Sequence, residues 1–152
     1  VNFREPRGLE LLQKLALDVD VVVENFKPGT TKSIGLDYDT LIKDAPQLIY
    51  TSITGFGTDG PYGQWPGYDQ IAQGMSGMMS ITGQADGLPT RLGVPLADLV
   101  SGIWSALGTI TAIHHVQVMY IIILMGKGLL FGLKMSIIGL LMDMKIAITI
   151  FR

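Results

Sequence analysis

"DVVVEN", residues 20–25, and "QLIYTSIT", residues 47–54, are the two stretches that decide the fold. Both are short runs rich in β-branched or aromatic residues, which is typical of strands, and their apolar character predicts strands buried on both faces. Helical patterns precede and separate them. This alternation predicts an α/β fold, with a parallel sheet flanked by helices and strands near 19–24 and 47–53.

Apolar periodicity predicts the helices. Before the first strand, leucines recur at helical spacing, and Pro6 stands where a first helical turn begins. The stretches with helical character are 8–20, 30–35, 37–46, 68–81 and 96–115. The connections between them are rich in glycine and proline, which favours turns and loops.

Composition excludes several classes of function. The chain has 11 basic and 13 acidic residues, a net charge of −2 and no cysteine. No basic patch indicates a nucleic-acid partner. The lack of cysteine excludes disulfides, zinc–thiolate sites and thiol catalysis. The methionines of "GMSGMMS", residues 74–80, fit helix packing better than a metal site, so no metal is expected.

The composition changes sharply at Val118. From there to the last residue the chain has no proline, a single acid and an excess of Ile, Leu and Met. The break predicts two parts, 1–117 and an apolar tail, 118–152. Lysines interrupt the tail before a run of the roughly 20 apolar residues that a spanning helix needs, so no membrane partner is expected. We expect the tail to be helical or poorly ordered.

Each predicted strand ends in a loop that could bind a ligand. "ENFKPG", residues 24–29, follows the first strand, and "TGFGTDGPYG", residues 54–63, follows the second. Ligands of parallel α/β sheets collect at the carboxyl ends of the strands, and glycines let the backbone approach an anion. Neither loop has a dinucleotide fingerprint or a Walker A motif. These glycines could equally serve only to form tight turns.

"GVPLADLVSG", residues 93–102, places one carboxylate, Asp98, just inside a predicted helix start. An acid in a first turn complements the helix dipole, and the same dipole favours an ionised nucleophile. The residue types leave both interpretations open. Asp69, in "PGYDQ", is expected to be a structural hydrogen-bonding acid, and Glu24 has no partner that the sequence identifies.

Several motifs in order carry a family resemblance from Val1 to about His115. They are "DVVVENFKPG", "IGLDYDTL", "APQLIYTSITGFGTDGPY", "PGYDQIAQGMSGMMSITG" and "GVPLADLVSG". The series resembles the class III coenzyme A transferases, to which α-methylacyl-CoA racemase is related. The resemblance implies a Rossmann-like large domain, incomplete in these 152 residues, and an interlocked homodimer.

The resemblance also implies the roles of particular residues. Asp98 matches the aspartate nucleophile of the motif A-D-x-x-x-G. No cofactor would be permanently bound, because a coenzyme A thioester is the substrate and a small carboxylate the second partner. The residues that would contact coenzyme A are Arg4, Asn25, Phe26, Lys27, Thr54, Gly55, Phe56 and Gly57. The compartment implied is mitochondrial or cytoplasmic.

The expected function is transfer of coenzyme A from an acyl-CoA, such as succinyl-CoA, to a small carboxylic or dicarboxylic acid. One alternative is a catalytically incompetent fragment that only binds coenzyme A or a second subunit. A second is a racemase, which the pattern disfavours because "GYD", residues 67–69, stands where the racemases have G-H-D. His114 and His115 are expected at the far end of the last helix, in a capping or exposed position.

Overall fold

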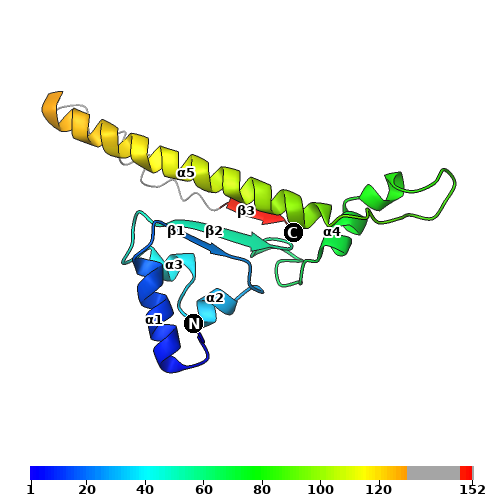
Figure 1. The fold of residues 1–152 in the computed structure, drawn as a ribbon, viewed down its shortest axis with the longest axis horizontal. Helices are drawn as coiled ribbons and strands as arrows, with labels where there is room; N and C mark the ends of the chain where they lie inside the picture. The colour runs from blue at the N-terminus through cyan, green and yellow to red at the C-terminus, as the bar shows by residue number, and fades with distance from the viewer. Residues whose placement is uncertain (130–147, 152) are drawn as a thin grey trace.

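The computed structural model describes residues 1–129 and 148–151 (Figure 1). The helices and strands, in chain order, are α1 (Pro6–Leu17), β1 (Val21–Glu24), α2 (Thr30–Ser33), α3 (Tyr38–Leu41), β2 (Ile49–Thr54), α4 (Asp69–Met75), the 3₁₀ helix η1 (Met78–Ile81), α5 (Leu96–Leu129) and β3 (Ile148–Phe151). Each helix predicted from the sequence is present. The stretch 68–81 divides at Gly77, whose φ of 78° ends the α-helical turn pattern and precedes η1.

β1 and β2 pair in parallel, as the sequence predicts. The register runs from Val21 opposite Ile49 to Glu24 opposite Ser52. Both strands therefore end at the same edge of the sheet. The loop after β1 and the loop after β2 emerge there together, which is the arrangement that creates a ligand site in parallel α/β sheets.

An apolar core covers one face of the sheet. In Figure 1, α1, α2 and α3 lie on this side and α5 lies on the other. Leucines and alanines of α1, α3 and the connecting segments pack against Val22 and Tyr50 of the strands. The fully buried members are Ala16, Leu36, Leu41 and Leu48. This cluster holds α1, α3 and the segment after α2 against the sheet.

Small residues of α5 face the opposite side of the sheet. Ser101, Ser105 and Ala112 are buried along one stripe of the helix. Thr109 Oγ1 lies 2.8 Å from Thr51 Oγ1 on β2, within hydrogen-bond distance. Because these side chains are short, the helix can lie close to the strand, and α5 begins near the carboxyl end of β2 (Figure 1).

Large apolar residues occupy the outer side of α5. Ile103, Leu107 and Ile110 are all more than half exposed. Among the described residues, the stretch Leu96–Met119 is long and apolar enough to cross a bilayer by length and composition alone. Core helices of soluble proteins also meet that criterion, so it gives only weak support for a membrane segment.

The prediction that the first strand is buried on both faces is wrong. No residue of β1 is fully buried, and Val23 is 59% exposed. Val23 pairs with Thr51 and shares its face of the sheet. The helix α5 packs over β2 and β3 on that face and leaves the edge strand β1 uncovered. β2 is the better covered strand, with Thr51 and Thr54 buried.

One expectation for the tail is confirmed and one is wrong: residues 118–129 are helical, whereas residues 148–151 form a strand. α5 continues through Gln117 to Leu129 because no proline or capping signal interrupts the run of Val, Ile, Leu and Met. His114 and His115 consequently lie within the helix rather than at its end, and His114 is exposed, as the sequence predicts. Residues 148–151 are neither helical nor unordered: they form β3, which pairs in parallel with β2. The remainder of the predicted tail, 130–147 and 152, lies outside the described residues.

Candidate active site

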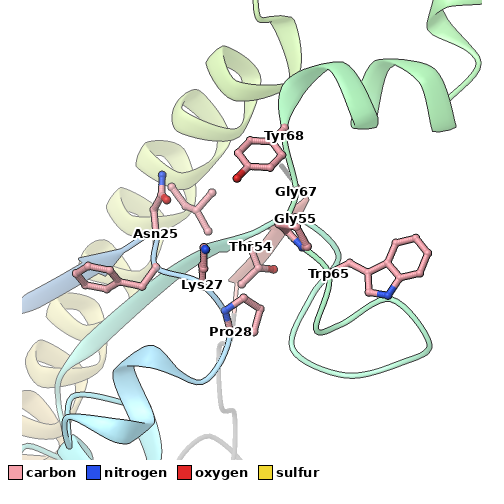
Figure 2. Close-up of a pocket in the computed structure, with 11 residues that line it drawn as sticks. Asn25, Lys27, Pro28, Thr54, Gly55, Trp65, Gly67 and Tyr68 are labelled. Atoms are coloured by element: carbon pink, nitrogen blue, oxygen red, sulfur yellow. The ribbon is translucent and has the colours of Figure 1, made fainter.

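An open pocket of about 140 Å³ lies at the carboxyl ends of β1 and β2. The loop after β1 forms one wall, and the end of β2 with residues 65–68 forms the other. Figure 2 shows Asn25 and Lys27 on one side and Gly55, Gly67 and Tyr68 on the other, with Trp65 directed away from them. The lining residues are Asn25, Phe26, Lys27, Pro28, Ile53, Thr54, Gly55, Trp65, Pro66, Gly67 and Tyr68.

Glu24 builds the first wall. One oxygen of its carboxylate, Oε2, accepts a hydrogen bond of 2.8 Å from the backbone N–H of Phe26. The other, Oε1, accepts a hydrogen bond from the hydroxyl of Ser52, which the strand register places directly opposite. Glu24 thus ties the turn after β1 to β2 and sets the direction in which Asn25 and Lys27 leave the strand.

Glycines close the second wall. A Cβ on Gly55 would lie 2.2 Å from the Cα of Gly67, so any side chain there would separate the two loop segments. Gly57 has a φ of 83°, in the left-handed region, and its N–H donates to Thr54 Oγ1 at 2.9 Å. The geometry of the loop itself thus requires glycine at positions 55 and 57. This agrees with the interpretation that the glycines serve to form tight turns.

An aromatic cluster supports the same loop. The rings of Phe56, Tyr62 and Trp65 lie with their centroids 4.9 to 6.4 Å apart. Offset and edge contacts of this kind stabilise a segment that has little regular structure. The cluster holds residues 55–67 in a compact fold beside the pocket.

Asp98 lies in the first turn of α5, as the sequence predicts, and is partly buried. The residue before it, Ala97, donates its backbone N–H to Asp69 Oδ1 at 2.8 Å. Asp69 is buried, and it directly follows Tyr68 of the pocket wall. The expectation that Asp69 is a structural hydrogen-bonding acid is confirmed. Tyr68 of the pocket wall is thus linked to the turn that carries Asp98 through the hydrogen bond between Asp69 and Ala97.

The structure brings some of the expected coenzyme A residues together and leaves others apart. Five line the pocket: Asn25, Phe26, Lys27, Thr54 and Gly55. Phe56 and Gly57 continue the same loop but do not line it.

Arg4 and Asp98 also lie outside the lining. Arg4 is exposed near the N-terminus, where its backbone N–H donates to Asn2 Oδ1. Its neighbour Phe3 contacts the ring of Phe26, with 6.1 Å between the centroids. The N-terminal segment therefore reaches the first wall through Phe3 rather than through Arg4.

Sequence reasoning missed three residues that shape the site. The sequence identifies no partner for Glu24, and no local pattern marks Ser52 or Gln73. Their partners are 19 to 28 residues away in the chain and become neighbours only through the strand register and the packing of α4. The available signal was the position of Glu24 and Ser52 near the ends of two strands that pair in parallel.

Comparisons with known proteins agree with the motifs. Residues 1–119 match the model of CoA-transferase family III. The chain is 48% identical to succinate–glutarate CoA-transferase of Agrobacterium fabrum over 114 residues. The aligned region covers 75% of this chain and 28% of the relative. It is 48% identical over 112 residues to succinyl-CoA:glutarate CoA-transferase of Mus musculus, covering 74% of this chain and 26% of the relative.

A solved structure matches the fold. The crystal structure of a CAIB/BAIF family protein from Brucella suis superposes with a TM-score of 0.72 and 45% sequence identity, over 76% of this chain and 30% of that protein. The chain spans less than a third of the length of these relatives. Matched in sequence over residues 1–119 and in fold over three quarters of its length, the chain belongs to CoA-transferase family III.

Proposed function

We propose that this chain carries the nucleophile and part of the coenzyme A site of an enzyme that moves coenzyme A from an acyl-CoA to a small carboxylic or dicarboxylic acid. Succinyl-CoA is the proposed donor, since the relatives named above act on succinate, succinyl-CoA and glutarate. The observation that carries the proposal is the hydrogen bond from the backbone N–H of Ala97, the residue before Asp98, to Asp69, which directly follows Tyr68 of the pocket wall.

The proposed reaction proceeds through covalent intermediates on Asp98. Its carboxylate attacks the thioester carbonyl, the C–S bond breaks, coenzyme A leaves as a thiolate, and a mixed anhydride of Asp98 and the donor acid remains. The thiolate attacks the aspartyl carbonyl, which releases the donor acid and leaves coenzyme A on Asp98 as a thioester. The acceptor carboxylate attacks this thioester to form a second anhydride and a thiolate. Attack of that thiolate on the acceptor's carbonyl gives the new acyl-CoA and restores the carboxylate.

The pocket supports binding of part of coenzyme A. Lys27 contributes a cation, and Asn25 contributes an amide that can donate and accept hydrogen bonds. At about 140 Å³, the pocket is smaller than the roughly 300–1,000 Å³ typical of sites that enclose a whole ligand. We therefore assign it one portion of the coenzyme, with the thioester end extending towards Asp98.

Two alternatives compete with this proposal. A racemase needs a second proton-transferring group near the substrate, and Tyr68 stands at the position of the histidine in the racemase pattern. His114 lies 16 residues beyond Asp98 on the same helix, roughly 24 Å along its axis, too far to act with it. The other alternative is a fragment that binds coenzyme A without catalysing exchange, and an assay of acyl exchange distinguishes it from the proposal.

Substitution of Asp98 tests the proposal. In the protein expressed with the sequences that flank these residues in its transcript, Asp98→Asn and Asp98→Ala should lower the rate of acyl exchange at least about a thousand-fold. Binding of coenzyme A should be retained, because the pocket residues are unchanged. Exchange between succinyl-CoA and a panel of acids, and calorimetric titration with coenzyme A, measure the two quantities.

The matched control is Asp86→Asn, a substitution of an exposed acid in the loop before α5. Asp86 has a φ of 61°, a conformation that asparagine also adopts readily, so this variant should exchange at the parent rate. Near-normal exchange by Asp98→Ala would show that the acid only complements the helix dipole.

A further inference from the structure

Asp69 and Gln73 form a buried polar pair on α4. Their side chains are 7% and 1% exposed, and Gln73 Nε2 donates a hydrogen bond of 2.7 Å to Asp69 Oδ2. A buried carboxylate and amide are costly unless their hydrogen-bonding groups are satisfied. The remaining partners of this pair show what it does.

The pair binds the backbone that leads into α5 at three points. Gln73 Oε1 accepts from the N–H of Leu92 at 2.9 Å, and Gln73 Nε2 donates to the carbonyl of Val94 at 3.2 Å. Asp69 Oδ1 accepts from the N–H of Ala97 at 2.8 Å. The Ala97 N–H is one of the first-turn donors that have no partner within a helix. A side chain of another helix, α4, therefore caps the turn that carries Asp98.

We propose that Asp69 and Gln73 are positioning residues for Asp98, an inference that rests on the proposed role of Asp98 as nucleophile. The pair fixes residues 92–97 relative to α4, and Ala97 is covalently joined to Asp98. Asp69 also follows Tyr68, so the same contacts set the distance between the nucleophile and the pocket. A displacement of the reacting group by about 1 Å can lower a rate roughly a hundred-fold.

Swapping the carboxylate and the amide between positions 69 and 73 tests whether the pair positions Asp98. The swap separates this role from the general destabilisation that follows loss of a buried side chain. In Asp69→Asn, the new amide N–H₂ opposes the donor of Gln73. In Gln73→Glu, two carboxylates face each other. In the double variant Asp69→Asn/Gln73→Glu, an amide again donates to a carboxylate, and acceptors remain for the N–H groups of Leu92 and Ala97. The double variant keeps the parent's net charge, but it places a carboxylate oxygen, in place of a donor, beside the carbonyl of Val94.

Two measurements on this set give the test. Amide hydrogen exchange at Leu92 and Ala97 should accelerate at least about ten-fold in each single variant and return towards the parent rate in the double variant. In the protein with its flanking sequences, kcat should fall about ten- to a hundred-fold in the single variants, with KM for the acyl-CoA changed less than about two-fold. The double variant should recover most of kcat. Gln70→Glu, on the exposed side of α4, is the control and should change neither quantity.

Three outcomes would overturn the inference. Single variants that lose amide protection but keep kcat would show that the pair only stabilises the fold. A double variant that recovers amide protection but not kcat would show that the fall in kcat does not arise from displacement of residues 92–97. If the parent itself shows no acyl exchange, the proposed function fails and no nucleophile remains to be positioned; amide protection that still depends on Asp69 and Gln73 would then identify the pair as purely structural.

Discussion

Tyr50 shows how burial of one side chain limits the pH range of the fold. The residue is half-buried, its hydroxyl donates to the carbonyl of Leu36 at 3.0 Å, and its ring meets that of Tyr38 edge-on. Burial raises the pKa of Tyr50 to about 12, although the Thr31 side chain opposes part of the rise. A tyrosine in the unfolded chain ionises near pH ~10. The contribution of the buried, protonated Tyr50 hydroxyl to the free energy of unfolding is therefore complete below pH ~10. It is lost as the pH rises towards 12.

Tyr50→Phe should remove this alkaline loss. We expect the variant to be less stable than the parent by about 1 kcal/mol at neutral pH, because the hydrogen bond to Leu36 is missing. Between pH 10 and 12 the difference should shrink. Urea unfolding at pH 7, 10 and 11.5 measures it, with Tyr62→Phe in the exposed loop as the control. Parallel loss of stability by parent and Tyr50→Phe would contradict the assignment.

Individual site residues were predictable to the extent that their signal is local. The sequence predicts Asp98 at a helix start because Pro95 and the following apolar periodicity are adjacent to it. The partners of Glu24 and Gln73 were not predictable, since Ser52 and Leu92 approach them only in the folded chain. Hydrogen bonds between segments depend on register and helix packing, which no local pattern specifies.

At the scale of elements, α5 carries a glycine that its packing does not require. Gly102 lies in the helix four residues after Asp98, and a Cβ there would meet nothing within 4 Å. Glycine within a helix costs roughly 0.5–1 kcal/mol relative to alanine. Packing against the described residues therefore does not explain why this position is glycine. The absence of a side chain leaves open space on the helix one turn after Asp98.

Gly102→Ala should consequently raise stability and weaken catalysis. We expect a gain of about 0.5–1 kcal/mol in the free energy of unfolding, together with a higher KM for the acyl-CoA if the thioester lies across this face. Denaturant unfolding and steady-state kinetics give the two values. Ala106→Gly, an exposed position of the same helix, should lose similar stability with unchanged KM. A stabilised Gly102→Ala variant with parent kinetics would show that the substrate does not approach this turn.

The elements themselves differ in how well the sequence predicted them. β1, β2 and α1 followed from β-branched runs, leucine spacing and Pro6, signals that lie within each segment. The length of α5 did not, because the helical pattern of residues 96–115 continues into the apolar segment with no proline or capping residue to mark an end. The sequence does not predict β3, because an alternating run of four residues is too short to distinguish from the apolar residues around it. The strand is defined by its pairing with β2.

For the whole molecule, we propose that residues 1–117 form the folded unit and that the apolar segment after them is not required for it. A chain of residues 1–117 should keep the core around Leu41 and Leu48 and remain soluble to higher concentration, because it lacks the Ile- and Leu-rich segment that promotes association. Circular dichroism, thermal unfolding and light scattering at increasing concentration compare the two chains. A shorter chain that is less soluble, or unfolded, would show that β3 is needed to complete the sheet.

The central claim is that Asp98 becomes covalently bonded to the substrate, and trapping tests it most directly. The protein with its flanking sequences is incubated with succinyl-CoA and then treated with hydroxylamine, which converts an aspartyl anhydride or thioester to a hydroxamate. Mass spectrometry of the digested protein should show this modification at Asp98, dependent on the acyl-CoA and absent in Asp98→Asn. Exchange that proceeds without modification of Asp98, or with modification at another residue, would contradict the account.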